Sequence, residues 1–336
     1  MQQRWLAVGA LLLGACGAPK RSPVVAPTPS PAAAPTSSSA AGVVPEAWST
    51  KLDRDNALVG KVWDVKGEAF VDERALLERL APARFVLLGE RHDNPDHHRL
   101  QARVVEGLAR AGKKPAVVFE MLEVSQQAAV DGYRASPDAS AAGFGAALGW
   151  QHTSWPPFRE YQPIFEAAFV HRLPLFAGNL PQADAKALVK QGLPALSTER
   201  VRDLGLDLPF PAPLAASLLD ELRSSHCGQL PESLLGPMAL AQRARDAQMA
   251  QVLISAGGKD GAVLIAGGGH VRLDRGVPYQ LARTAPGVSV ASLVLREVRH
   301  GETNPKVYAA EEGPFDFVWF TPRGSDADPC ADFHAK

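Results

Sequence analysis

Short apolar runs that alternate with helical stretches constrain the fold of this chain more than any other feature. The run Arg84–Gly89 ends in glycine, and the stretch Pro95–Gly112 behind it carries leucine and valine at helical spacing. The same alternation recurs along the chain, which predicts a series of strands joined by helices. The predicted strands are Arg84–Gly89, Pro115–Phe119, Leu173–Ala177, Gly261–Ala266, Val288–Val298 and Phe315–Thr321.

Strands that are apolar on both faces and are separated by helices predict an α/β domain. Its central sheet should be mostly parallel and covered by helices on both faces. The segment 195–236 departs from this rhythm, because prolines interrupt its leucine-rich pieces, and it is interpreted as a small helical insertion that could act as a lid. One long helix over Pro237–Ala256 is expected to return the chain to the sheet. The predicted domain spans 48–322, and a C-terminal tail covers 323–336.

The N-terminal segment predicts export and attachment to a membrane surface. Arg4 precedes the apolar stretch Trp5–Leu13, which is typical of a signal-peptide core and too short to span a bilayer. The stretch ends in Leu13-Gly14-Ala15-Cys16, the pattern of a bacterial lipobox, so residues 1–15 would be removed and Cys16 lipidated. An ordinary secretory signal with a chance cysteine is the alternative. Acyl chains such as palmitate on Cys16 would anchor the protein, and Gly17 favours the outer membrane of a Gram-negative bacterium.

Composition limits the remaining possibilities. Residues 16–47 consist mainly of proline, alanine, serine and threonine, which predicts a flexible tether. Lys and Arg total 35 against 36 Asp and Glu, and no long basic block occurs, so nucleic acid is not an expected partner. Besides Cys16 the chain has Cys227 and Cys330, which could pair in an oxidising cell envelope or stay reduced.

Reactive side chains follow four of the predicted strands directly. Glu90 and His92 follow the first strand, Glu120 the second, Asn179 the third and His270 the fourth. Ligands of open parallel sheets bind beyond the carboxyl ends of the strands, where loops and helix N-termini converge. We therefore expect these side chains to surround one crevice, with solvated loop polarity as the alternative.

A predicted helix start explains part of the histidine-rich stretch that contains Glu90. Asn94 reads as an N-cap, Pro95 as the first helical residue, and Asp96 as a first-turn acid favoured by the helix dipole. His97 and His98 are neighbours on this helix and project roughly 100° apart. At most one of them is expected to face the crevice.

A cluster of aromatic residues between the second and third strands has two interpretations. Trp150, Trp155, Phe158 and Tyr161 could plug the core, or they could line a flat apolar pocket. In the second case Tyr161 would offer a phenolate, a hard ligand that suits ferric iron.

Taken together, these residues resemble the ChaN family of haem-binding uptake lipoproteins, a branch of the Tiki/TraB-like superfamily. The resemblance covers about Gly60 to Val298. The matching stretches are Leu88–Asn94 with His97-His98, Val118–Met121, Trp155–Glu166, Ala177–Pro181, Arg243-Ala244-Arg245-Asp246, Gly269–Arg272 and Gly276–Pro278.

The resemblance implies a haem-binding α/β fold on an outer-membrane lipoprotein, with a role in haem or iron acquisition. It also implies dimers that can bring haems together. In the wider superfamily, motifs matched here by Gly89-Glu90-Arg91-His92 and Gly267-Gly268-Gly269-His270 are linked to metal-dependent peptidase or esterase chemistry.

Two functions follow. In the first, which we favour, a haem-binding protein hands haem to an uptake receptor or transporter. The second is a metal-dependent hydrolase with a divalent ion, and a third possibility is an old active site that now only stabilises the fold. For haem binding, the candidate iron ligands are Tyr161, His92 and His270. The candidate partners of the haem propionates are Arg91 and Arg272, and the candidate wall residues are Trp155 and Asn179. For the hydrolase, the candidate metal-binding or catalytic residues are Glu90, His92, Glu120 and His270.

Overall fold

The structure is a computed structural model that describes residues 47–311, 313–327 and 330. The expected signal peptide, lipidated Cys16 and the tether up to residue 46 lie outside the described residues, as does part of the expected tail. None of the helices in the described part of the chain has the length and hydropathy needed to cross a bilayer.

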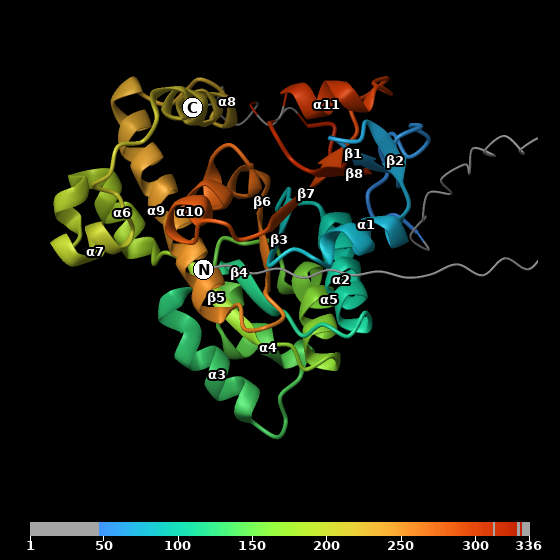
Figure 1. Cartoon of the computed structure of the whole chain (residues 1–336), viewed down its shortest axis with the longest axis horizontal. Helices are drawn as coiled ribbons and strands as arrows, with labels where there is room; N and C mark the ends of the chain where they lie inside the picture. Colours follow the sequence, from blue (N-terminus) through green and yellow to red (C-terminus); the bar gives the residue numbers. More distant parts are fainter. Residues whose placement is uncertain (1–46, 312, 328–329, 331–336) are drawn as a thin grey trace, which may run out of the picture. The chain divides into compact units, whose positions relative to one another are not determined.

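A single eight-stranded sheet forms the centre of the described domain (Figure 1). Its order is β2-β1-β8-β7-β3-β6-β4-β5. The six strands from β8 to β5 pair in parallel, whereas β1 pairs antiparallel with both β2 and β8. The strands are β1 (Val62–Asp64), β2 (Ala69–Val71), β3 (Phe85–Glu90), β4 (Ala116–Glu123), β5 (Leu175–Asn179), β6 (Ala262–Gly267), β7 (Val290–Glu297) and β8 (Phe317–Thr321).

The central strands are apolar on both faces because both faces are covered. Every residue of β3 and of β6 is buried. Along β3, Val86 and Leu88 point into one hydrophobic core, while Phe85 and Leu87 point into the other. This arrangement confirms the predicted α/β class and its mostly parallel sheet.

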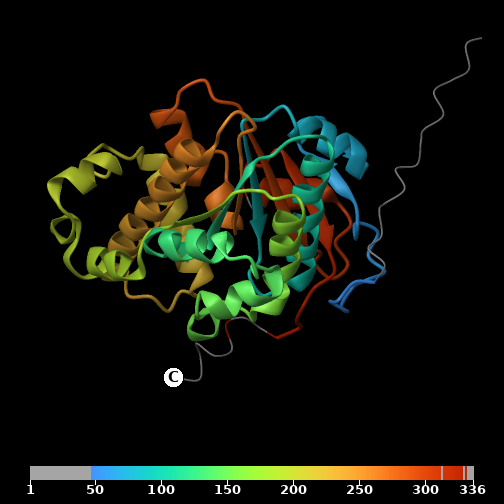
Figure 2. The same cartoon turned by 90° about the horizontal axis from the view of Figure 1, so that it is seen from below.

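Helices lie on both sides of this sheet (Figures 1 and 2). Residues of α1, α2, α4 and α5 share the first core with the sheet, and residues of α9, α10 and α11 share the second. The helices are α1 (Glu73–Leu80), α2 (Pro95–Arg110), α3 (Gln127–Ala135), α4 (Ala141–Ala147), α5 (Phe158–Val170), α6 (Gln182–Gln191), α7 (Thr198–Asp203), α8 (Ala212–Ser225), α9 (Glu232–Ala256), α10 (Gly276–Thr284) and α11 (Pro305–Glu311).

Several helix boundaries differ from the prediction. The strand predicted over Pro115–Phe119 continues as β4 to Glu123, so α3 begins only at Gln127. The long helix begins at Glu232 rather than at Pro237, so this proline lies inside α9. The strands β1 and β2 and the helix α1 were not predicted from the sequence.

The proline-rich segment 195–236 does contain helices, namely α7, α8 and the first turn of α9. These helices belong to two small hydrophobic clusters beside the sheet. Leu204 of α7's C-terminal cap packs in one with residues of α6 and α9, and Leu218 and Leu222 of α8 pack in the other with Leu235 of α9. The structure therefore places these helices against α6 and α9, and a lid remains a prediction.

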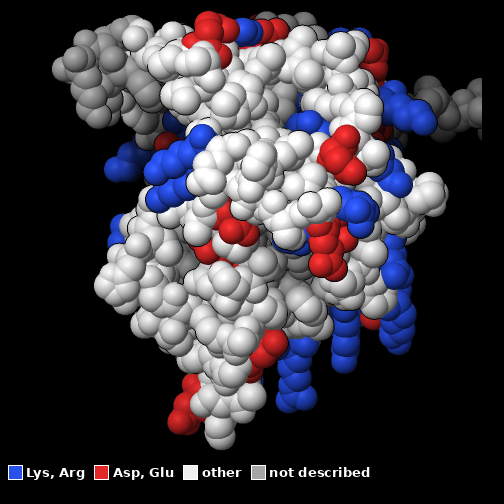
Figure 3. Space-filling view, turned by 90° about the vertical axis from the view of Figure 1, so that its left-hand side faces the viewer, with Lys and Arg blue, Asp and Glu red and all other residues white. Residues whose placement is uncertain are grey.

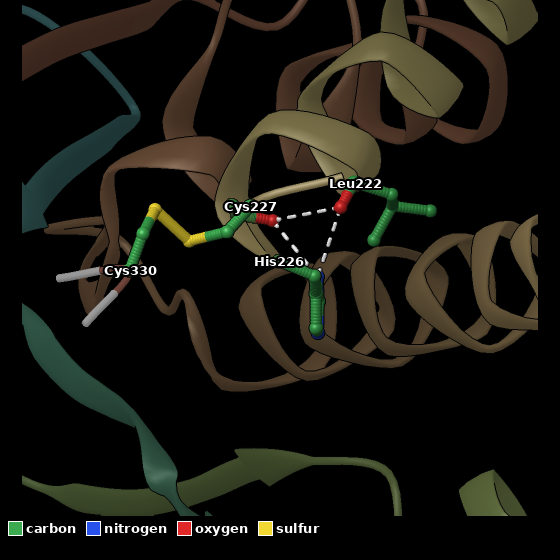
Figure 4. The surroundings of a disulfide bond; sticks show 5 residues. Leu222, His226, Cys227 and Cys330 are labelled. Atoms are coloured by element: carbon green, nitrogen blue, oxygen red, sulfur yellow. Dashed lines mark hydrogen bonds between the residues drawn. A yellow bond between two sulfur atoms is a disulfide. The ribbon is translucent and has the colours of Figure 1, made fainter. Parts of the chain in front are cut away.

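A disulfide joins the end of α8 to the C-terminal tail (Figure 4). Cys227 and Cys330 are 103 residues apart in sequence, and their Cα atoms lie 5.6 Å apart. Beside this bond, His226 Nδ1 lies 2.9 Å from the carbonyl oxygen of Leu222 in the last turn of α8. Of the two alternatives that the sequence left open for these cysteines, pairing is the one present.

Candidate functional site

Four predicted site residues meet at the carboxyl edge of the sheet. Glu90 ends β3 and stands in register with Gly267 at the end of β6. Glu120 lies on β4 where the pairing with β5 shifts register, between Phe119 and Glu123. A change of register of this kind turns side chains to new directions. The strand ends thus bring Glu90 and Glu120 together with His92 and His270, as the sequence predicted.

Glu120 is held by a backbone amide and a histidine. The N–H of Gly267 donates to Glu120 Oε2 at 2.7 Å, and His270 Nε2 lies 3.2 Å from Glu120 Oε1. The other ring nitrogen of His270, Nδ1, donates to Asp246 Oδ1 at 2.6 Å. His270 therefore lies between two carboxylates, and all three side chains are buried.

The charges of this group stabilise one another. Burial lowers the pKa of His270, but the charges of Glu120 and Asp246 more than offset that effect and raise it to about 10. Burial raises the pKa of Glu120, but His270 and the amide of Gly267 lower it to about 2. At neutral pH the group is therefore an imidazolium between two carboxylates. Asp246 was not predicted, although it ends the Arg243-Ala244-Arg245-Asp246 stretch.

Gly267 allows this close packing. A Cβ atom at this position would lie 2.9 Å from His92 Nε2 and 3.1 Å from its Cε1. Any larger residue would push the imidazole away from the strand end. The glycine that ends β6, one residue beyond the predicted strand, is thus explained by the approach of His92.

Glu90 is held mainly by aromatic partners. The hydroxyl of Tyr161 donates to Glu90 Oε1 at 2.6 Å, and His92 Nδ1 donates to the same oxygen at 2.9 Å. His98 Nε2 is 3.5 Å away, and its ring stacks on Tyr161 with centroids 3.8 Å apart. Burial raises the pKa of Glu90, but His98 and His92 lower it well below its ordinary value. Within the described residues, Glu90 Oε2 has no hydrogen-bond partner.

The structure does not support the sequence-based role of Tyr161 as a phenolate ligand. Its side chain is fully buried in the first core, and its hydroxyl proton is given to Glu90. Burial and the neighbouring charge of Glu90 raise the pKa of Tyr161 far above its ordinary value, which keeps it a neutral phenol. A hydroxyl held in this way is a donor and does not offer the free phenolate oxygen through which a tyrosine binds ferric iron.

The two adjacent histidines take different roles, as predicted. His98 faces Glu90, whereas His97 accepts from the N–H of Arg91 at 2.9 Å and its Nε2 lies 2.9 Å from Thr321 Oγ1. Burial holds the pKa of His97 well below its ordinary value, so it is neutral. The helix start is also confirmed, because Asn94 is the N-cap of α2 and Pro95 its first residue.

The two arginines predicted to bind propionates already have acidic partners. Arg91 pairs with Asp93 at 2.7 Å and lies 3.6 Å from Glu297. Arg272 pairs with Asp274 at 2.7 Å. A ligand carboxylate would have to displace these partners.

The aromatic cluster mostly fills the core, which is the first of the two interpretations that the sequence left open. Trp150 and Tyr161 are buried, and Phe158 packs against the same cluster. Trp155 is the exception: its ring meets the ring of His92 edge to face, with centroids 4.9 Å apart. The predicted pocket is thus reduced to one aromatic wall.

A pocket of about 590 Å³ opens beside the cluster and shares Glu120 with it. Most of its wall is polar, and Met121, Trp155 and Leu180 supply its apolar part. Asn179 donates to the carbonyl oxygen of Glu120 at 2.9 Å, and its Oδ1 has no partner within the described residues. The lining residues are Glu120, Met121, Glu123, Gln126, His152, Thr153, Ser154, Trp155, Asn179, Leu180, Gln182 and Arg245.

His152 and Arg245 are among the wall residues that were not predicted as site residues. His152 ends a short 3-10 helix (Trp150–His152) and is exposed; its Nε2 lies 3.2 Å from the side chain of its neighbour Gln151. Arg245 is on α9 and is partly buried. The sequence contained both, His152 within the aromatic cluster and Arg245 beside Asp246, but no local pattern indicates which side chain stays open.

The described residues contain no group of three or more His, Cys, Asp or Glu side chains that could hold a metal ion. His270 is not available to a metal ion, because both of its ring nitrogens are within hydrogen-bond distance of carboxylates.

Comparisons with known proteins agree with this architecture. A family model described as haem-binding uptake, Tiki superfamily, ChaN, matches residues 76–281. Among solved structures, ChaN of Campylobacter jejuni, described as binding heme cofacially, matches with a TM-score of 0.62 and 20% identity, over 77% of this chain and 95% of that one. This likeness shows a shared fold.

Two further solved structures match with lower scores. The type III effector HopBA1 matches with a TM-score of 0.37 and 10% identity, over 74% of this chain and 91% of that one. A mutant of the erythromycin esterase EreC in its open conformation matches with a TM-score of 0.38 and 15% identity, over 67% and 73%. No curated protein matches the chain.

Proposed function

We propose that this chain, which belongs to the ChaN family of haem-binding uptake proteins in the Tiki superfamily, binds haem in the pocket beside Glu120 as cargo for iron uptake. One observation carries the location: His152 and Arg245, an imidazole and a guanidinium, line a single pocket that Trp155 also lines. The first can bind iron, the second a carboxylate, and the ring can pack against a porphyrin face.

The pocket is of a suitable size for such a ligand. Small-molecule and cofactor sites occupy about 300–1,000 Å³, and this pocket measures about 590 Å³. Most cofactor pockets have apolar walls, whereas this wall is largely polar. A largely polar wall buries less apolar surface and binds more weakly, which suits a protein that passes its haem on.

His152 is the histidine best placed to hold iron. It lines the pocket and is exposed to solvent. His270 has both nitrogens engaged by carboxylates, and His92 Nδ1 donates to Glu90. A bound haem would supply the iron, and the task of this chain is to bind, orient and release it.

A larger groove of about 1080 Å³ between α1, α2 and α5 is a poorer candidate. Its charged side chains already pair with one another, Arg103 with Glu73 and Arg110 with Glu106. It also lacks any histidine, cysteine, tyrosine or methionine that could bind iron.

The cellular setting completes the proposal. The pattern ending in Cys16 supports lipidation and attachment to the outer membrane of a Gram-negative bacterium, after which residues 16–47 would act as a tether. From there the domain would pass haem to an uptake receptor or transporter, with a homodimer as the expected assembly.

The test is a haemin titration of the exported chain, purified in mild detergent and followed by absorbance. The expected result is a saturable shift of the Soret band, which the His152→Ala variant changes in position or intensity. His300→Ala is the matched control, because that side chain is 88% exposed and far in sequence from the pocket. A wild-type spectrum identical to that of free haemin would disprove haem binding.

Hydrolysis remains the second candidate, supported by the buried group of Glu120, His270 and Asp246. Strongly shifted pKa values of this kind occur both at active sites and in structural ion pairs. The same purified sample distinguishes the two functions. Stoichiometric divalent metal together with chelator-sensitive ester or peptide hydrolysis would favour the enzyme, whereas haem binding without hydrolysis would favour the carrier.

A further inference from the structure

Arg245 is a basic side chain on the wall of the pocket, without an acidic partner. The other charged groups on that wall are Glu120 and Glu123 and, when protonated, His152. Across the described part of the chain, Arg245 takes part in no hydrogen bond or ion pair. Guanidinium groups that are partly buried usually have partners, because their five N–H donors need acceptors once water is excluded.

Other arginines of the described chain show the usual arrangement. Arg275 pairs with Glu221, Arg272 with Asp274 and Arg91 with Asp93. Even Arg243, two residues before Arg245 on the same helix, donates to the carbonyl oxygen of Leu208 and stacks on Phe210, with 4.6 Å between the guanidinium carbon and the ring centroid. Arg245 differs from these arginines by having its donors available.

The neighbouring Asp246 fixes the direction of Arg245. Asp246 is buried and bonds His270, so this turn of α9 is held against the strand ends. Successive helical residues project about 100° apart, which directs Arg245 away from His270 and to the wall that it shares with Asn179 and Leu180.

Glu120 does not compete for this guanidinium. Its two oxygens are already bound by the amide of Gly267 and the imidazolium of His270. The charge of Glu120 is therefore compensated from inside the protein. Among the described residues no ion pair joins Arg245 to Glu120 or to Glu123, so Arg245 remains available to a carboxylate that enters from outside.

We propose that Arg245 binds a carboxylate of the ligand through forked hydrogen bonds, and that this carboxylate is a propionate of haem. The inference deepens the proposed function and rests on it. In this arrangement a propionate binds at α9, and the apolar porphyrin ring packs against Trp155.

The test compares haemin with haemin dimethyl ester, in which both propionates are neutral. For the exported chain in mild detergent, Arg245→Gln should raise the Kd for haemin about 10- to 100-fold, the usual worth of a charge-assisted bond. The Kd for the diester should be the same in the variant and the wild type. Arg245→Lys keeps the charge and loses the forked geometry, so its Kd for haemin should lie between those of the wild type and Arg245→Gln.

Arg159→Gln is the matched control, because that arginine is 78% exposed and lies outside the pocket wall. Thermal melts should show Arg245→Gln folding as stably as the wild type. Equal haemin affinities of variant and wild type would overturn the role of Arg245 while haem binding stands. Equal weakening for haemin and diester would also overturn it, because the side chain would then act through pocket shape. A wild type that binds neither compound would refute the proposed function itself, and the role of Arg245 with it.

Discussion

The cluster at the strand ends and the pocket beside it contain similar chemical groups, which differ in whether other groups of the protein bind them. In the cluster, the ionisable side chains of Glu90, Glu120 and His270 are held by partners inside the protein. In the pocket, His152 is exposed and Arg245 has no partner among the described residues. Histidines and charged groups at the same edge of one sheet can therefore serve the fold on one side and a ligand on the other.

The difference follows from burial. A charge inside the domain costs free energy unless it is paired and hydrogen-bonded, so the folded state keeps only those that have partners. Groups at the pocket wall do not carry this full cost, because the pocket is open to solvent, and a ligand can supply the partners that the protein does not. Substitutions in the cluster should thus change stability, and those in the pocket should change binding.

The largest effect is expected from a pair of histidine substitutions. His270→Ala leaves Asp246 and Glu120 as buried carboxylates without their cation, so it should lower the free energy of unfolding by about 3–5 kcal/mol. His152→Ala removes an exposed ring and should change it by less than about 0.5 kcal/mol. Urea unfolding measures both. Equal losses of unfolding free energy in the two variants would contradict the distinction between cluster and pocket.

The second prediction concerns pH. The pKa of His270 is raised from 6.5 to about 10, so its contribution is complete below pH 6.5 and is lost as pH rises toward 10. In that window the free energy of unfolding should fall by up to about 1.4 kcal/mol per pH unit. The pKa of His92 is also raised, so its deprotonation also lowers the free energy of unfolding as pH rises. Melts of wild type and His270→Gln between pH 6.5 and 9.5 test this, because the variant should show the shallower slope.

The smallest effect is expected from Tyr161→Phe. Glu90 loses one hydrogen bond and keeps His92, so the free energy of unfolding should fall by about 1–2 kcal/mol. The Soret band of the haemin complex should match that of the wild type. A changed band would return Tyr161 to the role of iron ligand and would place the cluster, not the pocket, in contact with haem.

Much of the fold could be predicted from the sequence. The six parallel strands, the N-cap Asn94 and the meeting of Glu120 with His270 follow from the period of apolar residues and from the geometry of parallel sheets. The short strands β1 and β2 were missed, because three residues show no period. The start of α9 was missed because Pro237 is tolerated inside the helix.

The assignment of roles within the site was less successful. One of the two interpretations of the aromatic cluster gave Tyr161 an open phenolate, whereas its hydroxyl is a buried donor. Asp246 was quoted only as part of a family stretch and proved to be a direct partner of His270. Arg91 and Arg272 were chosen for their position after strands, and both proved to be paired with acids.

The sequence by itself determined the six parallel strands, most of the helices between them and the edge of the sheet that collects the reactive side chains. Those properties depend on residues that are neighbours along the chain. Only the tertiary structure decided which of these side chains remain open to a ligand. Their partners come from distant segments: 71 residues separate Tyr161 from Glu90, and 147 separate Gly267 from Glu120. Pairing and burial are consequences of packing, and a local pattern carries no information about which distant group a side chain will meet.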